Sequence, residues 1–124
     1  MGVWGPGNFD SDTAADGLGI LTGRIVDDIT AEFEDDSRLE PDEWGGEMVP
    51  AWLEILTEIV QTQRVGATFP STTVLIDWRD RYLHVWDGYI DELEPGDDHK
   101  VARRAVLVHT FARAVAVAAE RERV

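Results

Sequence analysis

Four aspartates and one histidine recur at helical spacing in the second half of the chain. They are Asp77, Asp80, His84, Asp87 and Asp91, named here the acidic ridge. At about 100° per residue they form one narrow stripe, opposite the apolar residues of the same segment. Such a ridge could hold a divalent cation or bind a basic partner. A solvated helix face is the simpler interpretation, because ligands in a single helical row diverge instead of converging on a metal ion.

No other set of residues has the spacing of a known catalytic or metal site. His99 and His109 are isolated, and the chain has neither a His-Glu-x-x-His sequence nor a cysteine. No serine lies in a Gly-x-Ser-x-Gly turn, and no glycine-rich segment forms a phosphate-binding loop. Paired carboxylates such as Asp42-Glu43 would need one buried carboxyl group to work as an acid or base. We therefore assign no catalytic residue, metal ligand or cofactor from the sequence.

Trp44 is the one tryptophan of the five that the pattern places in a polar connection, between Glu43 and Gly45-Gly46. Aromatic residues surrounded by charge are frequent anchors at protein interfaces. Loop tryptophans that fold back onto a core are commoner. Trp44 is therefore a second interaction candidate beside the acidic ridge.

Helical periodicity predicts that these candidates lie on an all-α fold, a compact bundle of four main helices. The first helix follows an N-cap at Asp10 or Ser11 and ends near residues 34–36, with its continuity uncertain at Gly17, Gly19 and Gly23. The second is expected to begin at Pro50, because a first turn does not need the missing N–H, and to stop before residue 66.

The third predicted helix runs from an N-cap at Ser71 to about Leu93, and Asp97 caps the fourth after Pro95-Gly96. The apolar stripe of the first helix predicts its core face as Ala14, Leu18, Leu21, Ile25, Ile29 and Phe33. The corresponding stripe of the fourth helix consists of small residues suited to close helix packing or to a self-complementary seam: Val101, Ala105, Val108, Ala112, Val115 and Ala119.

Length and composition restrict the class of protein. The 124 residues suit a single helical domain, residues 1–124, and the formal net charge is −14. Residues 1–62 carry 15 acidic and two basic side chains. This charge disfavours direct nucleic-acid binding and favours a basic protein partner or divalent cations. The chain has no apolar run long enough to span a membrane and no cysteine, so we expect a cytoplasmic protein. The sequence leaves open whether the protein is a monomer or a homodimer.

The first residues carry a resemblance to a known family. Residues 1–9 hold glycines and a proline around two aromatic residues, which predicts an irregular arm packed on the bundle with Trp4 and Phe9 buried. This opening resembles that of a bacterial family of small proteins described as a domain of unknown function, with a Gly-x-Trp-Gly-x-Gly-x-Phe signature and a following aspartate motif. The matching positions are Gly2, Trp4, Gly5, Gly7, Phe9, Asp12, Ala14 and Asp16.

Later segments also resemble actinobacterial-type members of that family: residues 39–46, 78–95 and 103–111. The family has no assigned reaction, so the resemblance implies no mechanism. Two hypotheses for the function follow from the residues. The first is a non-catalytic interaction protein, such as an immunity or antitoxin-like protein that binds a basic partner. The alternative is a small metal-dependent hydrolase or ligand-binding bundle that uses carboxylates with His84 or His109.

Overall fold

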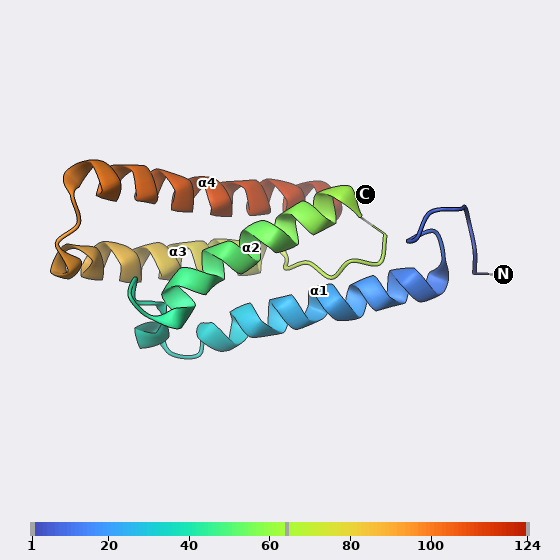
Figure 1. Ribbon diagram of the computed structural model, residues 1–124, viewed down its shortest axis with the longest axis horizontal. Coiled ribbons are helices and arrows are strands. Elements are labelled where there is room, and N and C mark those ends of the chain that lie inside the picture. The colour runs from blue at the N-terminus through green and yellow to red at the C-terminus, as the bar shows by residue number, and fades with distance from the viewer. Residues whose placement is uncertain (1, 64, 124) are drawn as a thin grey trace.

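The computed structural model describes residues 2–63 and 65–123 and contains four main helices (Figure 1). Met1 of the predicted arm, Arg64 and Val124 lie outside the described residues. The elements are α1 (Asp12–Glu32), η1 (Asp36–Leu39), α2 (Trp44–Thr62), α3 (Thr72–Tyr89), η2 (Ile90–Leu93) and α4 (Asp97–Glu122). In the described part of the chain, β-pairing is limited to one isolated bridge between Val3 and Ser11. The prediction of an all-α bundle is therefore confirmed.

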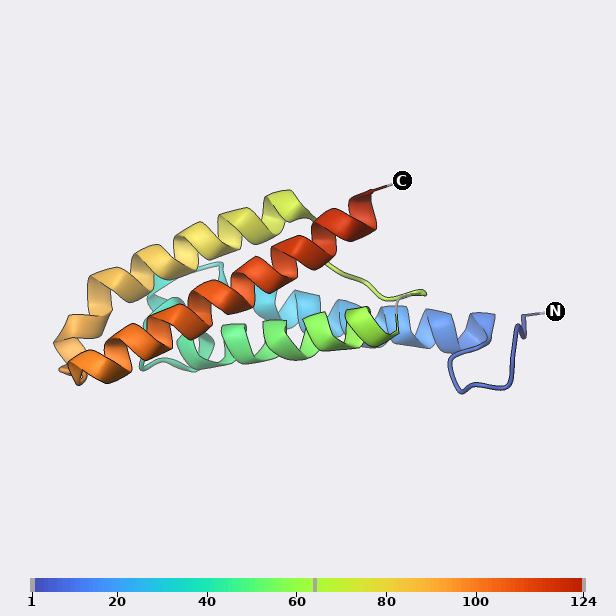
Figure 2. The ribbon, with the colours of Figure 1, turned by 90° about the horizontal axis from the view of Figure 1, so that it is seen from above.

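Helix α4 lies over the groove between α2 and α3, and α1 packs against α2 on the opposite side of the molecule (Figures 1 and 2). The short helix η1 packs against α2 and α3 and connects α1 to them. Across the described residues, no helix combines the length and apolar character that a membrane crossing requires.

Helix α1 is continuous through its three glycines. Ser11 is the N-cap, and its Oγ accepts a hydrogen bond from the backbone N–H of Ala14 at 3.1 Å. At Gly19 the backbone carbonyl of Gly66 approaches so closely that an added Cβ would lie 2.7 Å from its oxygen. Glycine at this position therefore allows the loop after α2 to approach the helix backbone closely.

The buried face of α1 differs from the predicted stripe near its N-terminus. Ala15 and Thr22 are buried, whereas Leu21 is exposed. Leu18 is buried as predicted, in a cluster with Val60 of α2 and Ala67, so the covered side of α1 runs through Ala15, Leu18 and Thr22 and leaves Leu21 in solvent. The first turns of α1 extend beyond the ends of the other three helices (Figures 1 and 2), and the loop after α2 lies against them there. The prediction holds further along the helix, where Ile29 is buried and Phe33 follows it into the core.

Helix α2 begins at Trp44, so the prediction of a start at Pro50 is wrong. Pro50 lies inside the helix, in its second turn, and cannot donate the usual N–H bond to the carbonyl of Gly46. The hydroxyl group of Tyr82 donates a hydrogen bond to that carbonyl instead, at 2.5 Å. A proline is tolerated here because the buried acceptor it leaves open has another donor.

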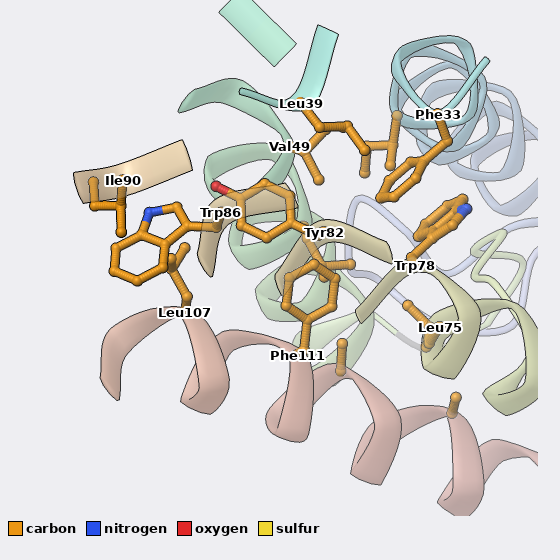
Figure 3. Close-up of a cluster of buried hydrophobic side chains, with 14 residues drawn as sticks. Phe33, Leu39, Val49, Leu75, Trp78, Tyr82, Trp86, Ile90, Leu107 and Phe111 are labelled. Atoms are coloured by element: carbon orange, nitrogen blue, oxygen red, sulfur yellow. The ribbon is translucent and has the colours of Figure 1, made fainter. Parts of the chain in front are cut away.

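The core is built on the buried face of α3, as its periodicity predicts. Leu75, Trp78, Tyr82 and Trp86 point into the bundle. Phe33 stacks on Trp78 with ring centroids 5.3 Å apart, and Tyr82 lies against Phe111 of α4 at 5.5 Å (Figure 3). The α-helix ends at Tyr89, and η2 continues to Leu93, the predicted end of the element.

The predicted core face of α4 is wrong. The residues that enter the core are Leu107, Thr110, Phe111, Ala114, Val117 and Ala118. Of the predicted stripe, only Val115 is partly buried, and the other five residues face solvent. Both faces of α4 are apolar, and the larger Leu107 and Phe111 side chains occupy the groove between α2 and α3. Gly96, and not Asp97, is the N-cap, without a side-chain cap bond.

Burial of Tyr82 predicts a loss of stability in alkali. Burial raises its pKa from 10.0 to about 12. The neutral phenol is the buried form, so its stabilising contribution is complete below pH 10 and disappears as the pH rises towards 12. We expect the free energy of unfolding, measured by urea denaturation at a series of pH values, to fall more steeply in this window for the native chain than for Tyr82→Phe. Equal slopes would contradict the assignment.

Candidate interaction site

The acidic ridge lies on the outer face of α3 and on η2, as predicted. Asp77, Asp80, His84, Asp87 and Asp91 are all exposed. His84 borders a shallow pocket of about 340 Å³ with Glu40 and Tyr89. The five side chains form a row along the surface and do not surround a common centre.

Ion pairs neutralise the four carboxylates of the ridge. Two partners are neighbours on α3: Arg79 contacts Asp80 at 2.9 Å and Arg81 contacts Asp77 at 3.7 Å. The other two come from the start of α4. Arg104 binds both oxygens of Asp87 at 2.9 Å, and Lys100 binds Asp91 at 2.6 Å.

The two pairs between helices lower the negative potential of the ridge. The hydrogen bonds from Arg104 hold the pKa of Asp87 below its usual value. The sequence analysis did not identify Arg104 and Lys100 as ion-pair partners of the ridge, although their spacing from the turn before α4 indicates the pairing. Residues 87 and 104, like residues 91 and 100, are equidistant from the Pro95-Gly96 turn and therefore face each other in an antiparallel helix pair.

Three carboxylates without such partners lie at the connection between η1 and α2. Glu40, Asp42 and Glu43 each offer an oxygen atom, and these atoms lie within 4.8 Å of one another. In residues 2–63 and 65–123, no ion pair is found for any of the three. Only the Asp42-Glu43 pair stood out in the sequence. The fold adds Glu40.

The ionisation of the Tyr89 hydroxyl group is affected by this concentration of negative charge. Its pKa is raised above the usual value by the negative charge of Asp42, by desolvation, and by Glu40, Glu92 and Glu43. Four carboxylates from two separate segments of the chain therefore act on one surface phenol. This end of the bundle has a strongly negative potential.

Trp44 lies directly beside these carboxylates, at the first residue of α2, and 66% of its surface is exposed. Its ring meets that of Trp52 edge-on, with centroids 6.2 Å apart and planes at 71°. The contact with Trp52 supports one side of the indole. We name Glu40, Asp42, Glu43 and Trp44 the acidic corner.

The backbone of the acidic corner is held in place by packing beneath it. Arg38 forms an ion pair at 2.9 Å with Glu32, whose side chain is only 8% exposed. Gly45 and Gly46 are buried against the backbone carbonyls of residues 38–40, where a Cβ would collide. The segment that presents the carboxylates is thus fixed against the start of α2.

The glycines of the N-terminal signature have a structural explanation. An added Cβ would lie 2.7 Å from a carboxylate oxygen of Asp12 at Gly2, and 2.7 and 2.6 Å from Asp10 at Gly5 and Gly7. Asp10 accepts a hydrogen bond from the N–H of Gly7 at 2.8 Å, a role that the sequence motif did not suggest. Glycine at these positions allows the carboxylates to approach the backbone.

The aromatic residues of the arm are not buried, so that prediction is wrong. Trp4 is 49% and Phe9 is 42% exposed. The arm closes on itself: the indole N–H of Trp4 donates to Asp12 at 3.0 Å, and the Val3–Ser11 bridge joins its two ends. Asp16, the last residue of the motif, is exposed on α1. A hairpin beyond the end of the bundle has no neighbouring helix to cover its rings.

Among the described residues, the serines take part in local hydrogen bonds, and no histidine belongs to a group of ligands suited to a metal ion. Within the described residues, the only three-membered group suited to a metal ion is Glu40, Asp42 and Glu43, without an imidazole. Ser11 and Ser71 cap helices, and Ser37 donates to Asp35.

A cavity of about 590 Å³ lies at the same end of the bundle as the acidic corner, between Glu47 of α2, Trp86 of α3 and the first turns of α4.

Comparisons with family models, curated proteins and solved structures found no match to this chain. The resemblance of the N-terminal signature to the domain-of-unknown-function family therefore stays a prediction.

Proposed function

We propose that the protein is a non-catalytic interaction module, immunity or antitoxin-like, which binds a basic protein partner at the acidic corner. The observation that carries the proposal is the exposed Trp44 ring beside three carboxylates without ion pairs among the described residues. The acidic ridge is a weaker candidate, because its four carboxylates already have cationic partners.

The acidic corner has the groups that an arginine side chain needs. A guanidinium group can stack on the indole of Trp44 and donate to the carboxylates of Asp42 or Glu43. The surrounding negative charge, concentrated in residues 1–62, would attract a basic protein over a longer range and speed its association. Because the corner is fixed by the packing of Gly45 and Gly46, little ordering is needed on binding.

We further propose that the chain works in the bacterial cytoplasm and is an actinobacterial-type member of the family that its opening residues resemble. The lack of cysteine and the acidic composition support this setting. The same charge supports the proposal that the protein does not bind nucleic acid directly.

The proposal is tested by titrating the protein with an arginine-rich peptide and with a lysine-rich peptide of equal charge. We expect tighter binding of the arginine-rich peptide, weakening with salt, and a loss of about 10-fold in affinity for Trp44→Ala, equivalent to about 1.4 kcal/mol. Isothermal titration calorimetry measures both effects. The matched control is Ile55→Ala, which truncates another exposed apolar residue of α2. Equal affinity of Trp44→Ala and Ile55→Ala would contradict the proposal.

The alternative of a metal-dependent hydrolase or ligand-binding bundle is supported by one observation. The cavity of about 590 Å³ lies at the same end of the bundle as the acidic corner, with Glu47, His99 and Arg103 at its border. A stoichiometric divalent ion in the purified chain, found by elemental analysis, would favour this alternative over the interaction module.

A further inference from the structure

The solvent-facing side of α4 is almost entirely apolar. Its residues are Val101, Ala102, Ala105, Val108, Ala112, Val115, Ala116 and Ala119, named here the outer face of α4. Val101 is 71% exposed, and Val115 alone is partly buried. Between residues 101 and 119, the exposed polar residues are Arg104, which pairs with Asp87, and His109. By contrast, the outward side of α3 carries the charged acidic ridge.

Six residues of the outer face follow a heptad pattern. They lie at positions 101, 105, 108, 112, 115 and 119, with alternating steps of four and three. This spacing is that of the seam between two helices in a coiled coil. It made the stripe look like core in the sequence, yet the core of the bundle is filled from the opposite side of α4.

The sizes of the seam residues indicate what covers the face. Valine occupies 101, 108 and 115, and alanine occupies 105, 112 and 119. If a second α4 lies antiparallel, with the two-fold axis passing between residues 108 and 112, each valine meets an alanine: 101 with 119, 108 with 112, and 115 with 105. Large and small side chains then interdigitate in every layer. A parallel pair would place valine against valine and alanine against alanine.

Charge supports a second copy at this face. Helix α4 has five basic and four acidic residues, whereas the whole chain carries −14. Two copies of so acidic a protein repel less where they meet through α4, because it is the one main helix whose basic side chains outnumber its acidic ones. Antiparallel packing also brings the acidic first turn, with Asp97, beside the end of the partner helix, where Arg123 is exposed. Neither residue has an ion-pair partner within the described chain.

We propose that the outer face of α4 is a homodimer interface in which two copies of this helix pack antiparallel, with the two-fold axis passing between Val108 and Ala112. The interface is separate from the acidic corner and does not depend on the proposed function. It is isologous, because each copy contributes the same surface.

Sedimentation equilibrium of the full chain tests the dimer. We expect a mass of twice 13.9 kDa for the native protein and a loss of at least 10-fold in dimer affinity for Ala112→Arg. Arginine retains helix propensity at this exposed site, so the monomer should keep its circular dichroism spectrum. The control is Ala51→Arg, at an exposed alanine of α2, which should remain dimeric. A native chain that stays monomeric at high concentration would overturn the proposal.

Cysteine cross-linking tests the direction of the helices, since the native chain has no cysteine. In the proposed dimer, a mixture of Val101→Cys and Ala119→Cys chains forms disulfide-linked dimers. Either variant alone does not, because like positions lie about 27 Å apart along the helix axis. Efficient cross-linking of each variant alone would indicate a parallel pair and overturn the antiparallel assignment.

Discussion

Replacing Gly46 with alanine is expected to lower the free energy of unfolding by about 3 kcal/mol or more. Gly46 is buried in the first turn of α2, and an added Cβ would collide with the backbone carbonyl of Glu40 and lie 2.8 Å from that of Leu39. These neighbours are main-chain atoms, which cannot rotate away as a side chain could. The helix and the preceding segment would have to separate, which would also displace the acidic corner.

The matched control for this substitution is Gly88→Ala in α3. Gly88 is exposed, and a Cβ there meets no other atom within 4 Å. Alanine should therefore stabilise the protein by about 0.5–1 kcal/mol, since glycine loses more conformational freedom in a helix. Urea denaturation of both variants measures the difference. The close packing at Gly46 would be refuted if the two substitutions had the same sign.

The second large effect concerns the hydrogen bond between Tyr82 and the carbonyl of Gly46. The Tyr82→Phe variant keeps the ring contact with Phe111 but leaves a buried carbonyl without a donor, because Pro50 has no N–H. We expect a loss of about 1–3 kcal/mol in the free energy of unfolding. The Tyr89→Phe control removes a surface hydroxyl group and should change stability by less than about 0.5 kcal/mol.

Pro50→Ala provides the decisive test of this explanation. Alanine at residue 50 restores the N–H that an α-helix directs at the carbonyl of residue 46. The loss caused by Tyr82→Phe should then be smaller in the Pro50→Ala background, with a coupling of about 1 kcal/mol between the two sites. Guanidinium denaturation of the four proteins of the cycle measures it. Additive effects would show that the hydroxyl group does not compensate for the proline.

Sequence periodicity was enough to predict the helices that bury large side chains. The face of α3 with Trp78, Tyr82 and Trp86 could be assigned because one side of that helix is apolar and the other charged. Helix α4 has apolar residues on both sides, so periodicity alone could not decide which side enters the core. Leu107 and Phe111 settle it, because they bury more apolar surface than the valines and alanines opposite.

The candidate site could be predicted only in part. Trp44 was recognised from its charged surroundings, but the early start of α2 was missed because a proline normally marks a first turn. The exception at Pro50 depends on a hydroxyl group 32 positions away in the sequence, which no local pattern contains. Likewise, the loss of net charge on the acidic ridge depends on Arg104 and Lys100 from a different helix.

The overhang of α1 beyond the other helices has a consequence for the order in which the molecule opens. Its second turn is held by Leu18, which is buried in a cluster with Leu56 and Val60 of α2, and by Thr68 of the loop after α2, which donates to the carbonyl of Gly19 at 3.0 Å. Among residues 2–17, only Ala15 is buried, so the N-terminal hairpin and the first turn of α1 form a unit that can fray while α2, α3 and α4 stay folded. Amide protons there exchange by subglobal opening, at a lower free energy than those of the Phe111 layer.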